Sequence, residues 1–142
     1  MATGQYIKQN LLGSDIGTTV VRATLIPTTS YVATTAMDCR GFRQIDFFIE
    51  VDSAGSITKL TVKPEAGQTL SSTTVEYATY LTETVSLGVA TTNEYEVELN
   101  DPLPSSTPIY KVSLPVEGRY VRLSLKSDDA SGTVTVYATR RV

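Results

Sequence analysis

The chain has 142 residues, a formal net charge of −3, 41% hydrophobic residues and 19% charged residues. This composition is typical of one folded domain and argues against a disordered chain. Histidine is absent and Cys39 is the only cysteine, which excludes histidine-dependent catalysis, histidine metal ligands and an internal disulfide.

The charge pattern also limits the partners. Basic residues are scattered, with Arg140 and Arg141 the only adjacent pair, so no phosphate-binding stripe is visible and we expect no nucleic-acid partner. No segment approaches the roughly 20 apolar residues that span a bilayer, and the first residues lack a signal-peptide pattern. We therefore expect no membrane partner. The single cysteine further indicates synthesis in a reducing cytoplasm.

The N-terminal residues differ from the rest of the chain. Residues 1–17 show no sustained periodicity and contain three glycines, which predicts an extended arm ahead of a domain at residues 18–142. So short a segment cannot bury its apolar side chains in a core of its own. We expect it to make contacts between subunits, and the candidate contact residues are Gln5, Tyr6, Ile7 and Leu11.

The next segments predict strands. Residues 18–26 form a strand pattern that ends at Pro27, and residues 31–36 predict a short second strand. The clearest alternation of apolar and polar residues runs through residues 42–62, with turn residues at 52–56. This pattern predicts a hairpin, and we expect Pro64 to end its return strand.

The second half of the chain continues in the same manner. Residues 73–80 and 94–99 alternate as strands, and the proline-rich residues 100–108 predict a loop that connects two layers. Residues 110–114, 121–125 and 134–138 add three strands, and we expect the last two to pair as a closing hairpin. About eight or nine short strands with frequent turns predict an all-β fold, an antiparallel β-sandwich resembling a jelly roll.

One short motif suggests nucleotide binding. Residues 15–19, Asp-Ile-Gly-Thr-Thr, are similar to the first phosphate-binding loop of actin-like ATPases and sugar kinases. That fold needs two large α/β halves, and this chain has neither the length nor the strand and helix alternation for them. We therefore expect no nucleotide site.

Several acidic residues and the cysteine are candidates for catalysis or metal binding. Glu94, Glu96 and Glu98 are candidates for a glycosidase carboxylate pair, but their spacing is that of the solvated face of one strand. Asp128–Asp129 supply too few oxygen ligands for a known Ca²⁺ loop. Cys39 is expected to be a small buried side chain. We predict a non-enzymatic protein with no catalytic residue, cofactor or metal site.

Two regions resemble a known group of proteins. Residues 41–50 followed by 60–65, and residues 118–126 followed by 132–138, are similar to the hairpins of small virion-associated proteins of tailed bacteriophages. Such proteins often carry a tryptophan after the first hairpin, whereas this chain has Tyr77 or Tyr80 there.

The resemblance implies a capsid decoration (cement) protein or another head or tail accessory component. Its partners would be the major capsid protein or other virion proteins. The resemblance further implies a homo-oligomer, with a trimer favoured, that is made in the host cytoplasm and located in the virion.

A second resemblance supports an alternative. Residues 117–123 look like the penultimate strand of discoidin-like and galactose-binding sandwiches. This likeness implies a carbohydrate- or receptor-binding module of a phage tail. Sugar sites usually present exposed aromatic platforms, and the absence of tryptophan weakens this alternative.

Overall fold

A computed structural model describes residues 19–25, 27–52, 57, 59–71, 73–100, 109–128 and 132–142. The predicted arm at residues 1–17 and its candidate contact residues Gln5, Tyr6, Ile7 and Leu11 lie outside these ranges. The described residues form strands, turns and bends without a helix. The prediction of an all-β, antiparallel sandwich is confirmed.

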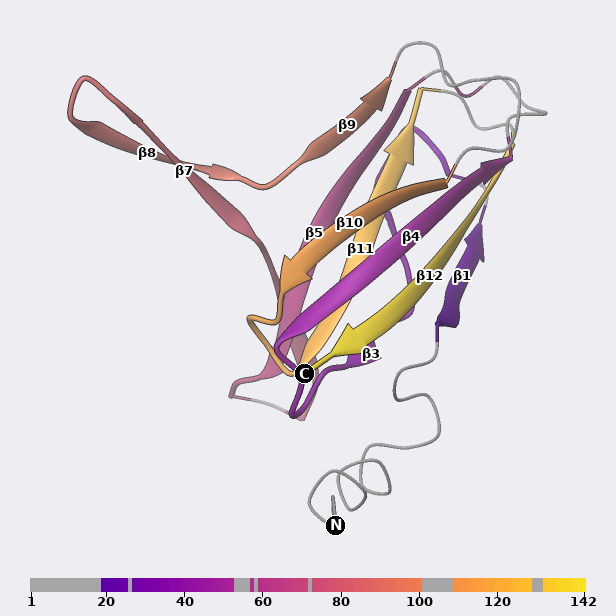
Figure 1. Cartoon of the computed structure of the whole chain (residues 1–142), viewed down its shortest axis with the longest axis horizontal. Coiled ribbons are helices and arrows are strands. Elements are labelled where there is room, and N and C mark those ends of the chain that lie inside the picture. The colour runs from indigo at the N-terminus through magenta and orange to yellow at the C-terminus, as the bar shows by residue number, and fades with distance from the viewer. Residues whose placement is uncertain are drawn as a thin grey trace.

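The first sheet has four antiparallel strands, and β12 and β4 lie at its centre (Figure 1). Their order across the sheet is β1 (Val20–Leu25), β12 (Thr133–Arg141), β4 (Gln44–Asp52) and β10 (Ile109–Pro115).

The second sheet packs behind the first and is centred on β11 and β5. Short strands share the outer edge of each central strand: β2 and β3 both pair with β11, and β6 and β9 both pair with β5. The strands are β2 (Val32–Ala33), β3 (Met37–Asp38), β5 (Lys59–Thr69), β6 (Val75–Thr79), β9 (Val97–Asn100) and β11 (Tyr120–Ser127).

The core lies between the two sheets and follows from the alternation of side chains along each strand. On β4 the apolar positions of the predicted pattern point inward, and Phe47 is completely buried. Buried aliphatic side chains of β5 and β11 face it from the other sheet, and those of β12 flank it in its own sheet. Each buried valine or leucine among them stabilises the fold by about 1.5–3 kcal/mol. These side chains are Leu60, Val62, Val121, Leu123, Leu125, Val134, Val136 and Ala138.

Both predicted hairpins are wrong in their pairing, although their strands exist. β4 pairs with β12 and β10, whereas β5 pairs with β11, β6 and β9 in the other sheet. In the same way β11 and β12 belong to different sheets. Alternation shows that a segment has one buried face, but it contains no information on which neighbour completes its hydrogen bonds. The connections after Asp52 and after Ser127 therefore cross between layers, as does the connection from β9 to β10.

Pro64 does not end its strand. It is buried within β5, opposite Leu123 of β11. On the other side of β5, the pairing with β9 extends as far as Val62 of β5, and the pairing with β6 begins at Glu65 of β5. The carbonyl of Pro64 accepts a hydrogen bond from the Tyr80 N–H at 3.1 Å, so its nitrogen faces the junction between β6 and β9. No ladder hydrogen bond is lost because the missing N–H falls in this gap.

A third pair of strands was not predicted. β7 (Leu81–Ser86) and β8 (Val89–Glu94) form an isolated antiparallel hairpin between β6 and β9. Figure 1 shows that this hairpin projects away from both sheets.

Candidate functional site

The β7–β8 hairpin is the most unusual surface of the described chain. All fourteen of its residues, 81–94, are exposed. Its large apolar side chains are exposed as well: Leu81 is 62%, Val85 64% and Val89 64% accessible, and Leu87 is fully accessible. A two-stranded hairpin without a packed face is at best marginally stable in water, so this element is expected to pack against a partner.

The turn of the hairpin adds backbone strain to this exposure. Leu87 and Gly88 have φ values of 51° and 78°, which makes a two-residue turn of the kind usually built from Asn-Gly. Gly88 adopts this conformation without cost, but a leucine in the left-handed region costs about 1–2 kcal/mol. The strained and exposed Leu87 is therefore better explained by contact with another molecule than by the folding of the hairpin itself.

The two faces of the hairpin differ. The register pairs Val85 with Ala90 and Ser86 with Val89. Because side chains alternate and opposed residues share a face, one face carries Leu81, Val85 and Ala90 together with Glu83, Thr92 and Glu94; we call it the apolar face of the hairpin, since it holds more large apolar side chains than the other. Val89 lies on the opposite face with residues that are otherwise hydroxyl or amide side chains: Thr82, Thr84, Ser86, Thr91 and Asn93.

The base of the hairpin is fixed to the sandwich. The Tyr95 N–H donates to the Tyr80 carbonyl at 2.7 Å, which joins the two strands where they leave the second sheet. The Tyr80 side chain is buried, and its hydroxyl donates to the Pro115 carbonyl at 2.6 Å and accepts from the Glu117 N–H at 3.3 Å. Burial raises the pKa of Tyr80 to about 12. A rigid base therefore carries a projecting, uncovered tip.

A second apolar surface lies on the outer face of the first sheet. Tyr137 of β12 is opposite both Val21 of β1 and Phe48 of β4, so the three side chains form one row across the sheet. Ile109 of β10 is adjacent and 62% exposed. Thr19, Phe48, Glu50, Ile109 and Tyr137 line a hollow of about 300 Å³. We call Val21, Phe48, Ile109 and Tyr137 the apolar patch.

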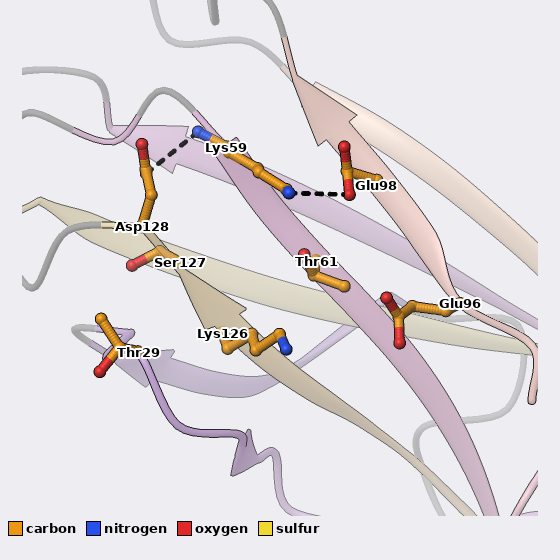
Figure 2. A pocket seen from close by; sticks show the side chains of 8 residues that line it. All are labelled: Thr29, Lys59, Thr61, Glu96, Glu98, Lys126, Ser127 and Asp128. Carbon is orange, nitrogen blue, oxygen red and sulfur yellow. Dashed lines mark hydrogen bonds and ion pairs between the residues drawn. The ribbon is translucent and has the colours of Figure 1, made fainter.

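The outer face of the second sheet has a polar groove of about 190 Å³ (Figure 2). Its side chains come from β5, β9, β11 and the segment before β2. They are Thr29, Lys59, Thr61, Glu96, Glu98, Lys126, Ser127 and Asp128. Hydroxyls, carboxylates and ammonium groups alternate along this groove, so its chemistry matches a ligand rich in hydroxyl groups.

Most charges of the groove are engaged within the molecule. The Lys59 ammonium forms an ion pair with Glu98 at 3.0 Å, and the main-chain N–H of Lys59 donates to the Asp128 carboxylate at 3.1 Å (Figure 2). The Tyr31 hydroxyl donates to Glu96 at 2.9 Å. Burial, and to a smaller extent the hydrogen bond and negative charge of Glu96, raise the pKa of Tyr31 to about 12. These contacts connect β9 to β5, the start of β5 to the end of β11, and the segment before β2 to the residue before β9.

The three glutamates that are candidates for a glycosidase carboxylate pair lie in different surroundings. Glu94 is the last residue of β8 and forms an ion pair with Lys63 at 3.2 Å, whereas Glu96 and Glu98 line the groove. On β9, Glu98 is exposed and Val97 and Leu99 are partly buried, as the alternation predicted.

Arginines from distant parts of the sequence converge at one end of the sandwich. The Asp38 carboxylate pairs with Arg40 at 3.1 Å and Arg119 at 3.5 Å, and the Asp38 carbonyl accepts from the buried Arg140 at 2.7 Å. Burial opposes ionisation of Asp38, but the hydrogen bonds and positive charge of Arg40 hold its pKa below the usual value. The sequence, in which these residues are scattered, does not predict this cluster, which ties β3 to β11 and β12.

Cys39 is buried beside this cluster, as predicted, and its thiol is within 3.4 Å of the Met37 carbonyl. Burial raises the pKa of the Cys39 thiol to about 12. A thiol with so high a pKa is protonated at neutral pH and is not a nucleophile.

The remaining comparisons concern the described residues and the sequence as a whole. In the described ranges, no group of three or more acidic or cysteine side chains is arranged to hold a metal ion. Within the same ranges, no helix is long and apolar enough to cross a membrane. No family model, curated protein or solved structure matches this chain.

Proposed function

We propose that this chain is a non-enzymatic structural protein of a bacteriophage particle, a capsid decoration (cement) protein that stabilises the head by binding major capsid subunits. The observation that carries this proposal is the β7–β8 hairpin, which exposes Leu81, Val85, Leu87 and Val89 outside the sandwich. Exposed apolar surface on a projecting element is typical of proteins that bind other proteins.

Two further features support this function. The hairpin has two free strand edges, which can add to a strand of a partner by main-chain hydrogen bonds. The sequence lacks histidine, and its one cysteine is a buried, protonated thiol, so the commonest nucleophilic and acid–base groups are missing. A protein of this kind acts by contact alone.

The arm remains part of the proposal. Gln5, Tyr6, Ile7 and Leu11 are predicted to make intersubunit contacts, in addition to those of the hairpin. A chain that lacks residues 1–15 should keep its fold and lose assembly, measured by circular dichroism and by incorporation into particles. Normal incorporation would contradict the role of the arm.

The experiment for the main proposal is co-sedimentation with empty shells assembled from the major capsid protein of the phage. We expect saturable binding by the wild-type chain and at least about tenfold weaker binding after Leu87→Asp, because a carboxylate would be buried in an apolar contact. Leu70→Asp, at a residue that is also exposed but lies outside the hairpin, is the matched control and should bind normally. Failure of the wild-type chain to bind shells would refute the proposal.

One observation favours the alternative function, a carbohydrate- or receptor-binding module of a phage tail. Hydroxyl and carboxylate groups line the groove of Figure 2, and one of these carboxylates, that of Glu96, accepts a hydrogen bond from the Tyr31 hydroxyl. Glycan-array binding that is abolished by Glu96→Gln and unaffected by Leu87→Asp would support this function. The absence of any glycan ligand would remove it.

A further inference from the structure

Two uncovered apolar surfaces lie on different layers of the molecule. The apolar face of the hairpin belongs to an element that leaves β6 and returns to β9, both in the second sheet. The apolar patch lies on the outer face of the first sheet. Because the hairpin projects away from the sandwich, it does not cover the patch of its own chain (Figure 1).

We propose that the hairpin of one copy docks on the apolar patch of a second copy, so that the chain self-associates through a head-to-tail contact. This inference uses the hairpin as the contact element, as the proposed function does, but names a second copy as its partner. A second copy is favoured because one contact covers both surfaces, and each molecule carries one of each.

The dimensions of the two surfaces match. Leu81 and Val85 are four residues apart on one face of β7, a distance of about 13 Å at roughly 3.3 Å per residue. The row from Val21 through Tyr137 and Phe48 to Lys111 crosses four neighbouring strands, which corresponds to about 14 Å at roughly 4.8 Å per strand. The apolar part of this row, from Val21 to Phe48, spans two strand spacings or about 10 Å, so Leu81 and Val85 are far enough apart to cover it.

The charges are also complementary. Residues 81–94 contain two glutamates and no lysine or arginine; Glu94 forms an ion pair with Lys63 of its own chain, so Glu83 is the one considered for a contact with a partner. At the margin of the patch, the Lys111 ammonium lies 5.9 Å from the centre of the Phe48 ring, and Lys111 is exposed. Glu50 lines the same hollow and would repel a carboxylate, so Glu83 is expected on the Lys111 side of the patch. This pairing would fix the orientation of the hairpin.

A contact between two different surfaces has a consequence for assembly. Each copy donates a hairpin to one neighbour and receives a hairpin from another. Such head-to-tail contacts lead to a closed ring or an open chain, because a dimer joined by a single contact still carries one free hairpin and one free patch.

The test is the self-association of the purified full chain without any capsid protein, measured by sedimentation velocity and light scattering over a range of concentrations. We expect concentration-dependent association of the wild type. Val85→Asp and Ile109→Asp should each weaken it at least about tenfold, because each places a carboxylate in the apolar contact. The matched control is Val89→Asp, on the opposite face of the same hairpin, which should change association less than about twofold. Thermal unfolding of each variant shows that it is folded.

A charge exchange tests the orientation separately. Glu83→Lys and Lys111→Glu should each weaken association, and the double variant should restore it. A wild-type chain that is monomeric throughout, equal effects of Val85→Asp and Val89→Asp, or no restoration in the double variant would each overturn the proposal. Binding to capsid shells is measured independently: a monomeric chain that binds shells refutes self-docking and leaves the proposed function intact, whereas an associating chain that ignores shells does the reverse.

Discussion

The substitution Tyr80→Phe tests how the base of the hairpin is held to the sandwich. Tyr80 is 5% exposed, and its hydroxyl bridges the Pro115 carbonyl and the Glu117 N–H. Phenylalanine keeps the ring and removes both hydrogen bonds, leaving two main-chain groups without these partners. We expect the free energy of unfolding to fall by about 1–3 kcal/mol, measured by urea unfolding at pH 7.

The same variant changes the response to alkaline pH. Burial raises the pKa of Tyr80 to about 12 in the folded state, whereas an unfolded tyrosine titrates near 10. The neutral hydroxyl therefore stabilises the fold fully below pH 10, and this contribution is lost as the pH rises through 12. Two pKa units correspond to at most about 2.7 kcal/mol. Phenylalanine cannot ionise, so the stability difference between wild type and Tyr80→Phe should shrink over this range.

Tyr31→Phe is the control for this experiment. Tyr31 also has a pKa raised to about 12, but its hydroxyl bonds Glu96 and shares neither the Pro115 carbonyl nor the Glu117 N–H with Tyr80. Its removal should leave the contribution of Tyr80 unchanged. The reasoning is refuted if wild type and Tyr80→Phe differ by the same free energy at pH 8 and at pH 11.5.

Three further predictions concern the thiol, an ion pair and the hairpin. Cys39 should react with a thiol reagent at neutral pH only on unfolding, because burial raises its pKa; rapid labelling of the native protein would contradict this. Asp46→Asn should cost about 1–3 kcal/mol at pH 7, since Asp46 is buried and pairs with Arg141 at 2.7 Å. Burial opposes ionisation of Asp46, but the hydrogen bond from Arg141 lowers its pKa below 3.8, so this cost should vanish as the pH falls through that lowered value. Replacing residues 82–93 with a short glycine link should change the free energy of unfolding by less than about 1 kcal/mol, because these residues are exposed; cooperative loss of the fold would show that the hairpin supports the sandwich.

The strands were predictable from the sequence because burial of one face leaves a local pattern. Ile45, Phe47, Ile49 and Val51 are all buried, and the positions between them are mostly polar, with Phe48 the exception. Partners were not predictable in this way. A turn sequence after Asp52 is compatible with a return along the same sheet and with a crossing to the other sheet, and only the packing of the whole chain decides between them.

Contacts across strands were also not predictable. The Tyr77 ring lies over Gly67, where an added Cβ would be 2.5 Å from the ring, and the Arg122 guanidinium stacks on the same ring at 3.6 Å. These three residues come from β6, β5 and β11. Their contact depends on the register between strands, which single-strand patterns do not contain. The sequence pattern therefore predicts Tyr77 as a strand residue but not its contacts with Gly67 and Arg122.

The hairpin was missed for a physical reason that bears on function. Residues 81–94 have no buried face, so they lack the regular alternation by which the other strands were found, and their turn has leucine where Asn or Gly is usual. A sequence selected only for folding would place a polar or flexible residue at position 87. Leu87 instead combines an exposed apolar side chain with a strained backbone, two unfavourable contributions that burial against a partner would offset in part. The residue that fits the isolated fold least well is thus the one whose substitution tests the proposed capsid contact.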